Sequence, residues 1–286
     1  MALVINTNTA SITAQRHLTS SRAEMEQAME RLSSGKRINS AMDDAAGLTI
    51  AHSLDSRVTS LNMAARNAND GISLINLAEG ALEEVTVMII RMRELAIESL
   101  NGTYSYNDRA NLELEYDALA SEITRISDNT FFNGISPIGT GETVTFQVGF
   151  ASSDTISVST ADMAATVLGA SANASSISIA SSTIVASSYA SVATEAGLTL
   201  TRLDEALQDV DSFRARMGAV ANRLQFSANN LYSRVEAQSA ARSRIEDADY
   251  AVESANLARA QVLQQAGTAM LSQANATTQN VLSLLK

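Results

Sequence analysis

The sequence predicts a mainly α-helical protein, built as a long antiparallel coiled-coil or helical-bundle rod with a small β-hairpin region at the tip. Three observations predict this fold. Apolar residues recur in steps of four and three along two long stretches, which is the heptad spacing of paired helices. Aromatic residues make up only 4% of the chain, and the chain contains one proline, so long thin helices fit better than a thick core. One short stretch alternates apolar and polar residues, as a β-hairpin does.

The first helix is expected between Ile5 and Leu32, where the larger apolar residues have helical spacing. It should end at Ser33–Ser34–Gly35–Lys36, since glycine commonly follows the last turn of a helix. A less regular segment is expected over residues 37–40.

Two heptad patterns then predict a pair of long helices that pack against each other. The second, from Leu203 to Val235, is apolar at each seam position except Arg214, which needs a carboxylate on the facing helix or must reach outward. Without a partner, such a helix would lose the roughly 1.5–3 kcal/mol of stabilising free energy that burial of each large apolar side chain provides. Its partner is the helix of the first pattern; the pattern begins at Leu54, and the helix should end near Asn101–Gly102. The expected core seam comprises Leu54, Val58, Leu61, Ile72, Ile75, Leu203, Leu207, Val210, Leu224 and Leu231.

Shorter elements separate the two long helices. A helix is expected from about Asn107 to Asp128, followed by a hairpin over Thr143–Val158 that turns through residues 151–154. A Ser-, Ala- and Thr-rich insertion with weak structure and high exposure is expected over Ser159–Ala196. Helix resumes near Leu198, is interrupted at residues 245–249, and continues as a last helix over residues 251–286.

Composition disfavours several functional classes. A net charge of −11 repels phosphate backbones, so nucleic-acid binding is not expected. The absence of cysteine excludes disulfides and thiol nucleophiles. His17 and His52 stand on different helices, and no convergent polar site is apparent, so we expect neither an enzyme nor a metal or other cofactor. The amino terminus lacks a signal peptide, and no stretch has the ~20 apolar residues of a membrane span, so a soluble chain is expected.

The terminal helices point to self-assembly. Ordering a residue costs roughly 1–2 kcal/mol, whereas burying an alanine methyl returns only about 0.8 kcal/mol. Both ends are rich in small and polar residues yet keep apolar stripes, so we hypothesise that they are largely disordered in the monomer and fold against other copies. Contacts that do not close into a ring give a helical filament. The expected assembly residues are Ile5, Ile12, Leu18, Met25, Leu32, Val262, Met270, Val281, Leu282, Leu284 and Leu285.

Three sequence blocks resemble the bacterial flagellins, the filament proteins of the flagellum. The first block is RLSSGKRINS at residues 31–40 with DDAAGL at 43–48. The second is RNANDGIS at 66–73 with EGAL at 79–82. The third is ARSRIEDADY at 241–250, followed by RAQVLQQAG at 259–267 and QNVLSLL at 279–285. The likeness covers roughly residues 1–150 and 198–286, in order and at both ends.

The resemblance implies a structural subunit that assembles into the extracellular flagellar filament used for swimming, exported through the flagellar channel without a cleaved signal peptide. The alternative is a hook-filament junction protein, which would share the terminal heptads. The implied domains are an inner D0 of residues 1–42 and 242–286, a D1 of residues 43–158 and 198–241, and a short variable insertion at residues 159–197 in place of an outer domain.

The resemblance also implies partners. Besides copies of itself, these are an export chaperone, the filament cap protein, the hook-filament junction protein and host Toll-like receptor 5, the last through Arg91, Leu95 and Glu122. The carboxyl-terminal Leu282, Leu284 and Leu285 match the segment that a cytosolic inflammasome sensor reads. Hydroxyl modification is expected in the Ser/Thr-rich insertion, with candidates Ser175, Ser176, Ser181, Ser182 and Thr183.

Overall fold

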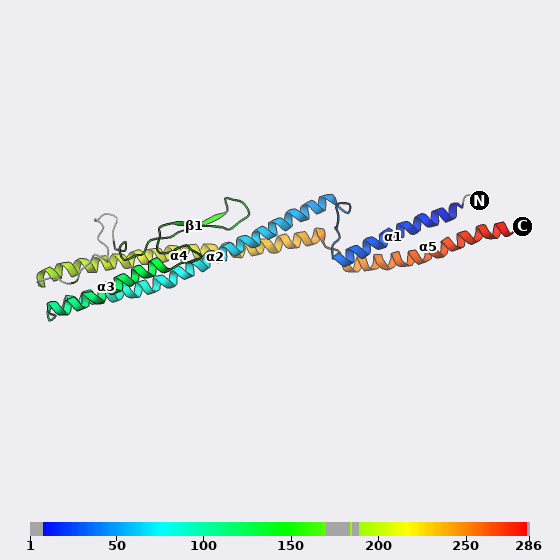
Figure 1. Ribbon diagram of the computed structural model, residues 1–286. Coiled ribbons are helices and arrows are strands. Elements are labelled where there is room, and N and C mark those ends of the chain that lie inside the picture. The colour runs from blue at the N-terminus through cyan, green and yellow to red at the C-terminus, as the bar shows by residue number, and fades with distance from the viewer. Residues whose placement is uncertain (1–7, 170–183, 185–188, 285–286) are drawn as a thin grey trace. The chain divides into compact units, whose positions relative to one another are not determined.

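The computed structural model describes residues 8–169, 184 and 189–284, and for residues 189–193 and 277–284 it describes the backbone alone. Over these residues the fold is mainly helical, with one two-stranded sheet (Figure 1). Its elements are α1 (Thr9–Ser34), α2 (Ala45–Ser99), α3 (Tyr106–Asn129), β1 (Thr143–Gln147), β2 (Thr155–Ser159), α4 (Tyr189–Glu246) and α5 (Tyr250–Leu284). The chain forms two compact units, unit 1 (Met1–Val58 with Glu236–Lys286) and unit 2 (Thr59–Val235).

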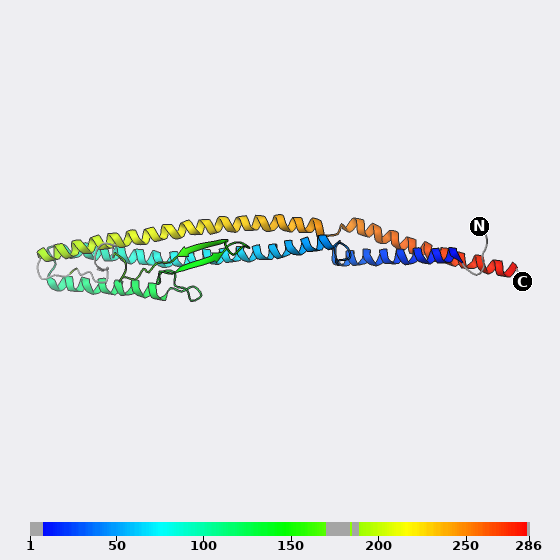
Figure 2. The ribbon, with the colours of Figure 1, turned by 90° about the horizontal axis from the view of Figure 1, so that it is seen from above.

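Unit 1 contains the paired helices α1 and α5, which run side by side in both views (Figures 1 and 2). At the start of α1, the Asn8 side chain accepts a hydrogen bond from the Ser11 N–H at 3.0 Å. Gly35 ends the helix at a φ of 71°, where its N–H donates to the Arg31 carbonyl at 2.9 Å. A positive φ is where glycine is favoured, so the predicted stop at residues 33–36 is confirmed.

Unit 2 is built on the predicted heptad seam. Parts of α2 and α4 pack antiparallel, with Leu61, Ile75, Leu203, Val210, Leu224 and Leu231 all buried. Arg214 reaches α2, where its Nε donates to Glu79 Oε1 at 2.8 Å, so the expected carboxylate partner is confirmed. The third helix, α3, adds Tyr116 and Ile123 to the same core.

The turn from α2 to α3 is held by one buried cation. Arg109 donates from Nε to the Ser99 carbonyl at 2.9 Å and from Nη2 to the Asn101 carbonyl at 3.3 Å. A guanidinium at this place satisfies carbonyls that the end of α2 leaves without helical partners. Arg109 thus stabilises the carboxyl end of α2, which lies at Ser99, two residues before the predicted Asn101–Gly102 stop.

The β-hairpin forms as predicted, but its place does not match the prediction. β1 and β2 are antiparallel, with Phe146 opposite Ile156 and Val144 opposite Val158. The hairpin lies against the middle of α2, not at the tip: the Asn67 side chain donates to the Gln147 carbonyl at 3.1 Å. The cause is packing across unit 2, because the inward Ile156 and Val158 belong to the core shared by α2 and α4.

The Ser-rich insertion was expected to be exposed and weakly structured over residues 159–196. Residues 160–169 indeed form neither helix nor strand, but the expected exposure is wrong, and so is the expected weak structure from Tyr189 onward. Met163, Ala165 and Leu168 are buried, and so is Ile184. Helix α4 begins at Tyr189, nine residues before the predicted Leu198. Small and weakly apolar residues suit a loop and a packed segment equally well, so composition alone misjudged this stretch.

Candidate functional site: the α1–α5 helix pair

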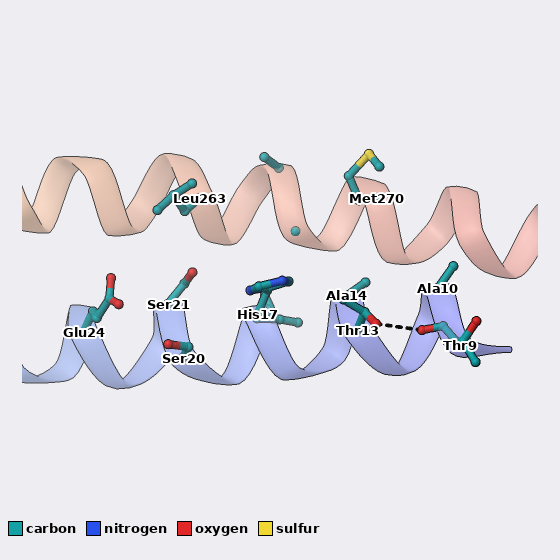
Figure 3. A pocket seen from close by; sticks show the side chains of 13 residues that line it. Thr9, Ala10, Thr13, Ala14, His17, Ser20, Ser21, Glu24, Leu263 and Met270 are labelled. Atoms are coloured by element: carbon teal, nitrogen blue, oxygen red, sulfur yellow. Dashed lines mark hydrogen bonds between the residues drawn. The ribbon is translucent and has the colours of Figure 1, made fainter.

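An open groove runs along the α1–α5 pair (Figure 3). It has a volume of about 730 Å³ and opens between the early turns of α1 and the middle of α5. Much of its wall is apolar, and the polar side chains that line it all come from α1: Thr9, Thr13, His17, Ser20, Ser21 and Glu24. The apolar residues that line it are Ala10, Ala14, Leu18, Leu263, Ala266, Gly267 and Met270.

Small side chains bring α1 and α5 together. Ala28 of α1 and Ala260 of α5 are each 2% exposed. Near the groove, a Cβ added at Gly267 would lie 3.3 Å from Leu18 Cδ1, which is closer than ordinary contact. The two helices therefore approach closely while burying few large side chains.

Large apolar side chains remain on the outside of the same pair. Ile12 is 58% exposed, Val262 64%, Leu263 45% and Met270 64%. Scattered exposed residues of this kind are ordinary, but here they follow one helix pair and flank an apolar groove. The arrangement suits a further helix that would bury them.

A polar network fixes the chain between α1 and α2. Asp43 Oδ2 accepts hydrogen bonds from the Ser40 N–H at 2.9 Å and from the Ser40 hydroxyl at 3.0 Å, while Oδ1 accepts from Gln27 Nε2 at 3.0 Å. These bonds favour the charged form and lower the pKa of Asp43 from its usual 3.8 to about 2; the Ser40 N–H contributes most. The network ties the connecting segment to α1.

The same segment also pairs with the chain between α4 and α5. The Arg37 N–H donates to the Glu246 carbonyl at 2.6 Å, and the Ala248 N–H donates to the Gly35 carbonyl at 2.9 Å. Lys36 forms an ion pair with Glu246. The segment that follows α1 and the segment that follows α4 are thus held together by backbone hydrogen bonds.

The predicted assembly residues fall into four groups. Leu18, Met25 and Leu32 are half-buried, whereas Ile12, Val262 and Met270 are exposed. Ile5 and Leu285 lie outside the described residues. Val281, Leu282 and Leu284 belong to α5, whose backbone alone is described there. Of the core seam, Leu54, Val58, Ile72 and Leu207 are half-buried, in addition to the six buried residues named above.

The three predicted receptor residues do not share one surface. Arg91 is exposed and donates to Glu115 on α3 at 2.8 Å and to Glu94 at 2.9 Å. Glu122 is partly exposed and accepts a bond from Arg125 Nη2 at 2.6 Å. Leu95 is 0% exposed and packs in the core of unit 2. A side chain in that position cannot touch a partner, so the expectation for Leu95 needs correction.

The sequence analysis missed the Asp43 network and the buried Arg109. Serine followed three residues later by aspartate, as at Ser40 and Asp43, is a local turn signal that could have found the first. An isolated arginine carries no such signal, because the carbonyls that it meets are defined only by the turn. The modification candidates Ser175, Ser176, Ser181, Ser182 and Thr183 lie outside the described residues.

No helix in the described part of the chain combines the length and apolarity that crossing a bilayer requires. Within residues 8–169, 184 and 189–284, no group of three or more His, Cys, Asp or Glu side chains is placed to hold a metal ion.

Comparison with known proteins decides the family. A family model described as the bacterial flagellin N-terminal helical region matches residues 5–140, and one described as the C-terminal helical region matches residues 200–285. The chain is 43% identical to a flagellin of Xenorhabdus nematophila over 317 aligned residues, which span 100% of both chains. The chain belongs to the flagellin family.

Other flagellar relatives agree along their whole length. A flagellin of Halalkalibacterium halodurans is 41% identical and aligns with 99% of this chain and 100% of its own. The flagellar filament 33 kDa core protein of Treponema phagedenis is 38% identical over 99% of this chain and 100% of its own. As a flagellin, the chain is a structural, non-enzymatic subunit of the extracellular flagellar filament, which favours this function over the hook-filament junction alternative.

Proposed function

We propose that the α1–α5 pair is the element through which this flagellin joins neighbouring copies. The observation that carries the proposal is the exposed apolar stripe beside the groove, above all Val262, Leu263 and Met270. Burial of apolar surface returns about 25 cal/mol per Å², and a filament repeats each contact on many subunits. A modest gain at each contact is then enough for a stable polymer.

We propose further that the terminal helices gain much of their stability on assembly. The α1–α5 contact is made largely by small side chains such as Ala28, Ala260 and Gly267, which return little free energy on burial. Amide hydrogen exchange on dilute monomer checks this point. Exchange in α1 and α5 should be fast in the monomer and slow in the filament, and strong protection of both helices in the monomer would contradict the proposal.

The sharpest test of the assembly surface uses L263N with M270N. Two amides in place of the groove-lining apolar side chains should raise the critical concentration for polymerisation about tenfold, since tenfold corresponds to ~1.4 kcal/mol. The matched control is Q261N with Q273N, which puts two asparagines at exposed positions of α5 that do not line the groove. Sedimentation of polymer at graded protein concentration measures the effect. Equal critical concentrations for the two variants would reject the proposed surface.

The domain arrangement follows as part of the same proposal. Residues 1–42 and 242–286 would form the inner D0 layer, residues 43–158 and 198–241 the D1 layer, and residues 159–197 the short insertion. The family supports the same set of partners as before: an export chaperone at the carboxyl end, a cap protein, the junction protein and Toll-like receptor 5. For the receptor, Arg91 and Glu122 are the accessible candidates, and Leu95 would act only by supporting α2 from within.

A further inference from the structure

Charge is divided unevenly along α4. From Tyr189 to Asp211 the helix carries five acidic residues and one arginine. From Ser212 to Val235 it carries no acidic residue but four arginines, which are Arg214, Arg216, Arg223 and Arg234. This basic stretch stands out in a chain with a net charge of −11.

One of the four arginines has a carboxylate partner, and two others lie against aromatic rings. Arg214 is paired with Glu79, and the Arg234 guanidinium lies 5.8 Å from the centre of the Phe150 ring. Arg216 and Arg223 are exposed, and neither forms an ion pair with any residue that the structure describes. Arg216 lies 5.7 Å from the centre of the Phe213 ring, a cation–π contact that does not neutralise its charge.

The neighbouring strand β2 has backbone groups that point away from its partner strand β1. The Thr160 N–H donates to the Glu142 carbonyl and the Val148 N–H to the Asp154 carbonyl, so even-numbered residues bond across the hairpin. In an antiparallel pair the alternate residues point their N–H and C=O groups the other way. Ser157 and Ser159 therefore present backbone groups at the free edge of β2.

A pocket of about 280 Å³ brings these two features together. Ser157, Val158 and Ser159 of β2 line one side, and Arg216 and Arg223 of α4 line the other. Guanidinium forks and backbone N–H groups are the donors that bind carboxylates most strongly. Among the residues that the structure describes, no carboxylate lines the pocket, so its two arginines make it cationic.

We propose that this pocket binds a side-chain carboxylate of a second copy of the chain. Charge complementarity favours that occupant, because the chain has 31 acidic and 20 basic residues and a filament surrounds each subunit with copies of itself. The inference rests on the proposed assembly, and it adds a contact in unit 2 to the one in unit 1. An exposed sheet edge is also a place where proteins commonly accept a partner.

The test exploits the scarcity of lysine, which occurs only at Lys36 and Lys286. R216K and R223K each add a single amine to the pocket and keep its charge. A small fraction of unlabelled variant is mixed with ¹⁵N-labelled wild type, and the mixture is polymerised. A carbodiimide then joins amines to carboxylates that are in contact, forming an amide with loss of water. Mass spectrometry then finds the joined peptides, and a pair with one labelled and one unlabelled member comes from two copies.

We expect mixed-label pairs from R216K and R223K that identify the partner carboxylate. The matched control is R66K, on an exposed arginine of α2 outside the pocket, which should give about tenfold fewer pairs because amide formation needs contact geometry. Filaments without mixed-label pairs, pairs within one copy only, or equal yields from R66K would overturn the inference. Should a lysine variant not enter filaments, R216E is compared with R66E by incorporation, and equal incorporation overturns the inference as well.

Failure of this proposal differs from failure of the assembly proposal. If L263N with M270N polymerises like its control, the assembly surface on α1 and α5 is wrong whatever the cross-linking shows. If that variant fails to polymerise while R216K filaments carry no mixed-label pairs, only the pocket is wrong.

Discussion

At the scale of single residues, Asp43 links acidity to the stability of unit 1. Hydrogen bonds from Ser40 and Gln27 hold its pKa at about 2, below the usual 3.8. A carboxyl whose pKa falls on folding stabilises the fold above the unfolded pKa, and this contribution is lost as pH falls through the folded pKa. The Asp43 contribution should therefore be complete above about pH 4 and disappear toward pH 2.

Replacement of that carboxyl gives a direct check. In the polymerised protein, in which unit 1 is folded, D43N should lower the midpoint of thermal unfolding at pH 7, and the gap to wild type should close as pH falls from about 4 to 2. D128N, at an exposed position on α3, serves as the control and should leave the midpoint nearly unchanged. Circular dichroism melts at a series of pH values measure both, and a gap that stays constant with pH would contradict the assignment.

At the scale of elements, two glycines in α2 separate helix propensity from packing. A Cβ added at Gly80 meets nothing within 4 Å, whereas one added at Gly71 would lie 2.9 Å from Leu224 Cδ1 and 3.3 Å from the Phe146 ring. G80A should raise the free energy of unfolding by roughly 0.5–1 kcal/mol. G71A has the same propensity gain but must displace the buried Leu224, so it should be less stable than G80A. Denaturant unfolding compares the two, and equal values would show that α4 and the hairpin do not restrict Gly71.

The long helices were predictable because their signal is local and repeated. Buried Leu203, Val210, Leu224 and Leu231 recur at heptad spacing, and each repeat reinforces the same conclusion. The hairpin strands were also predictable from alternation. Their position beside Asn67 was not, because it depends on a contact between residues 80 positions apart.

The candidate site was predictable only in part. The stripe containing Ile12, Val262 and Met270 follows from helical spacing, and these residues are exposed. The burial of Leu95 could not be predicted from its match to a family pattern. Whether a helical side chain faces the core or the solvent is decided by the elements that pack around the helix. The pocket at Arg216 needed the free edge of β2, which appears only after the hairpin has found its place.

At the scale of the whole molecule, net charge governs how copies meet. With a charge of −11, subunits repel one another at low ionic strength, and the Debye length shortens to ~8 Å at physiological salt. Kosmotropic anions increase the free energy gained when the apolar side chains of α1 and α5 are buried. We expect polymerisation to increase with added salt, and more with sulfate than with chloride at equal ionic strength. Light scattering follows the polymer, and a signal that stays flat or falls as salt rises would contradict this expectation.

The uneven charge of α4 has a consequence for how subunits align. If two parallel copies had their α4 helices side by side and in register, the acidic residues 189–211 would face each other, and so would the arginines of residues 212–235. A copy displaced along the helix axis would instead meet opposite charge. If α4 helices of parallel copies lie side by side in the filament, their charges would favour a displacement along the helix axis, and a displacement repeated from subunit to subunit gives a helical assembly.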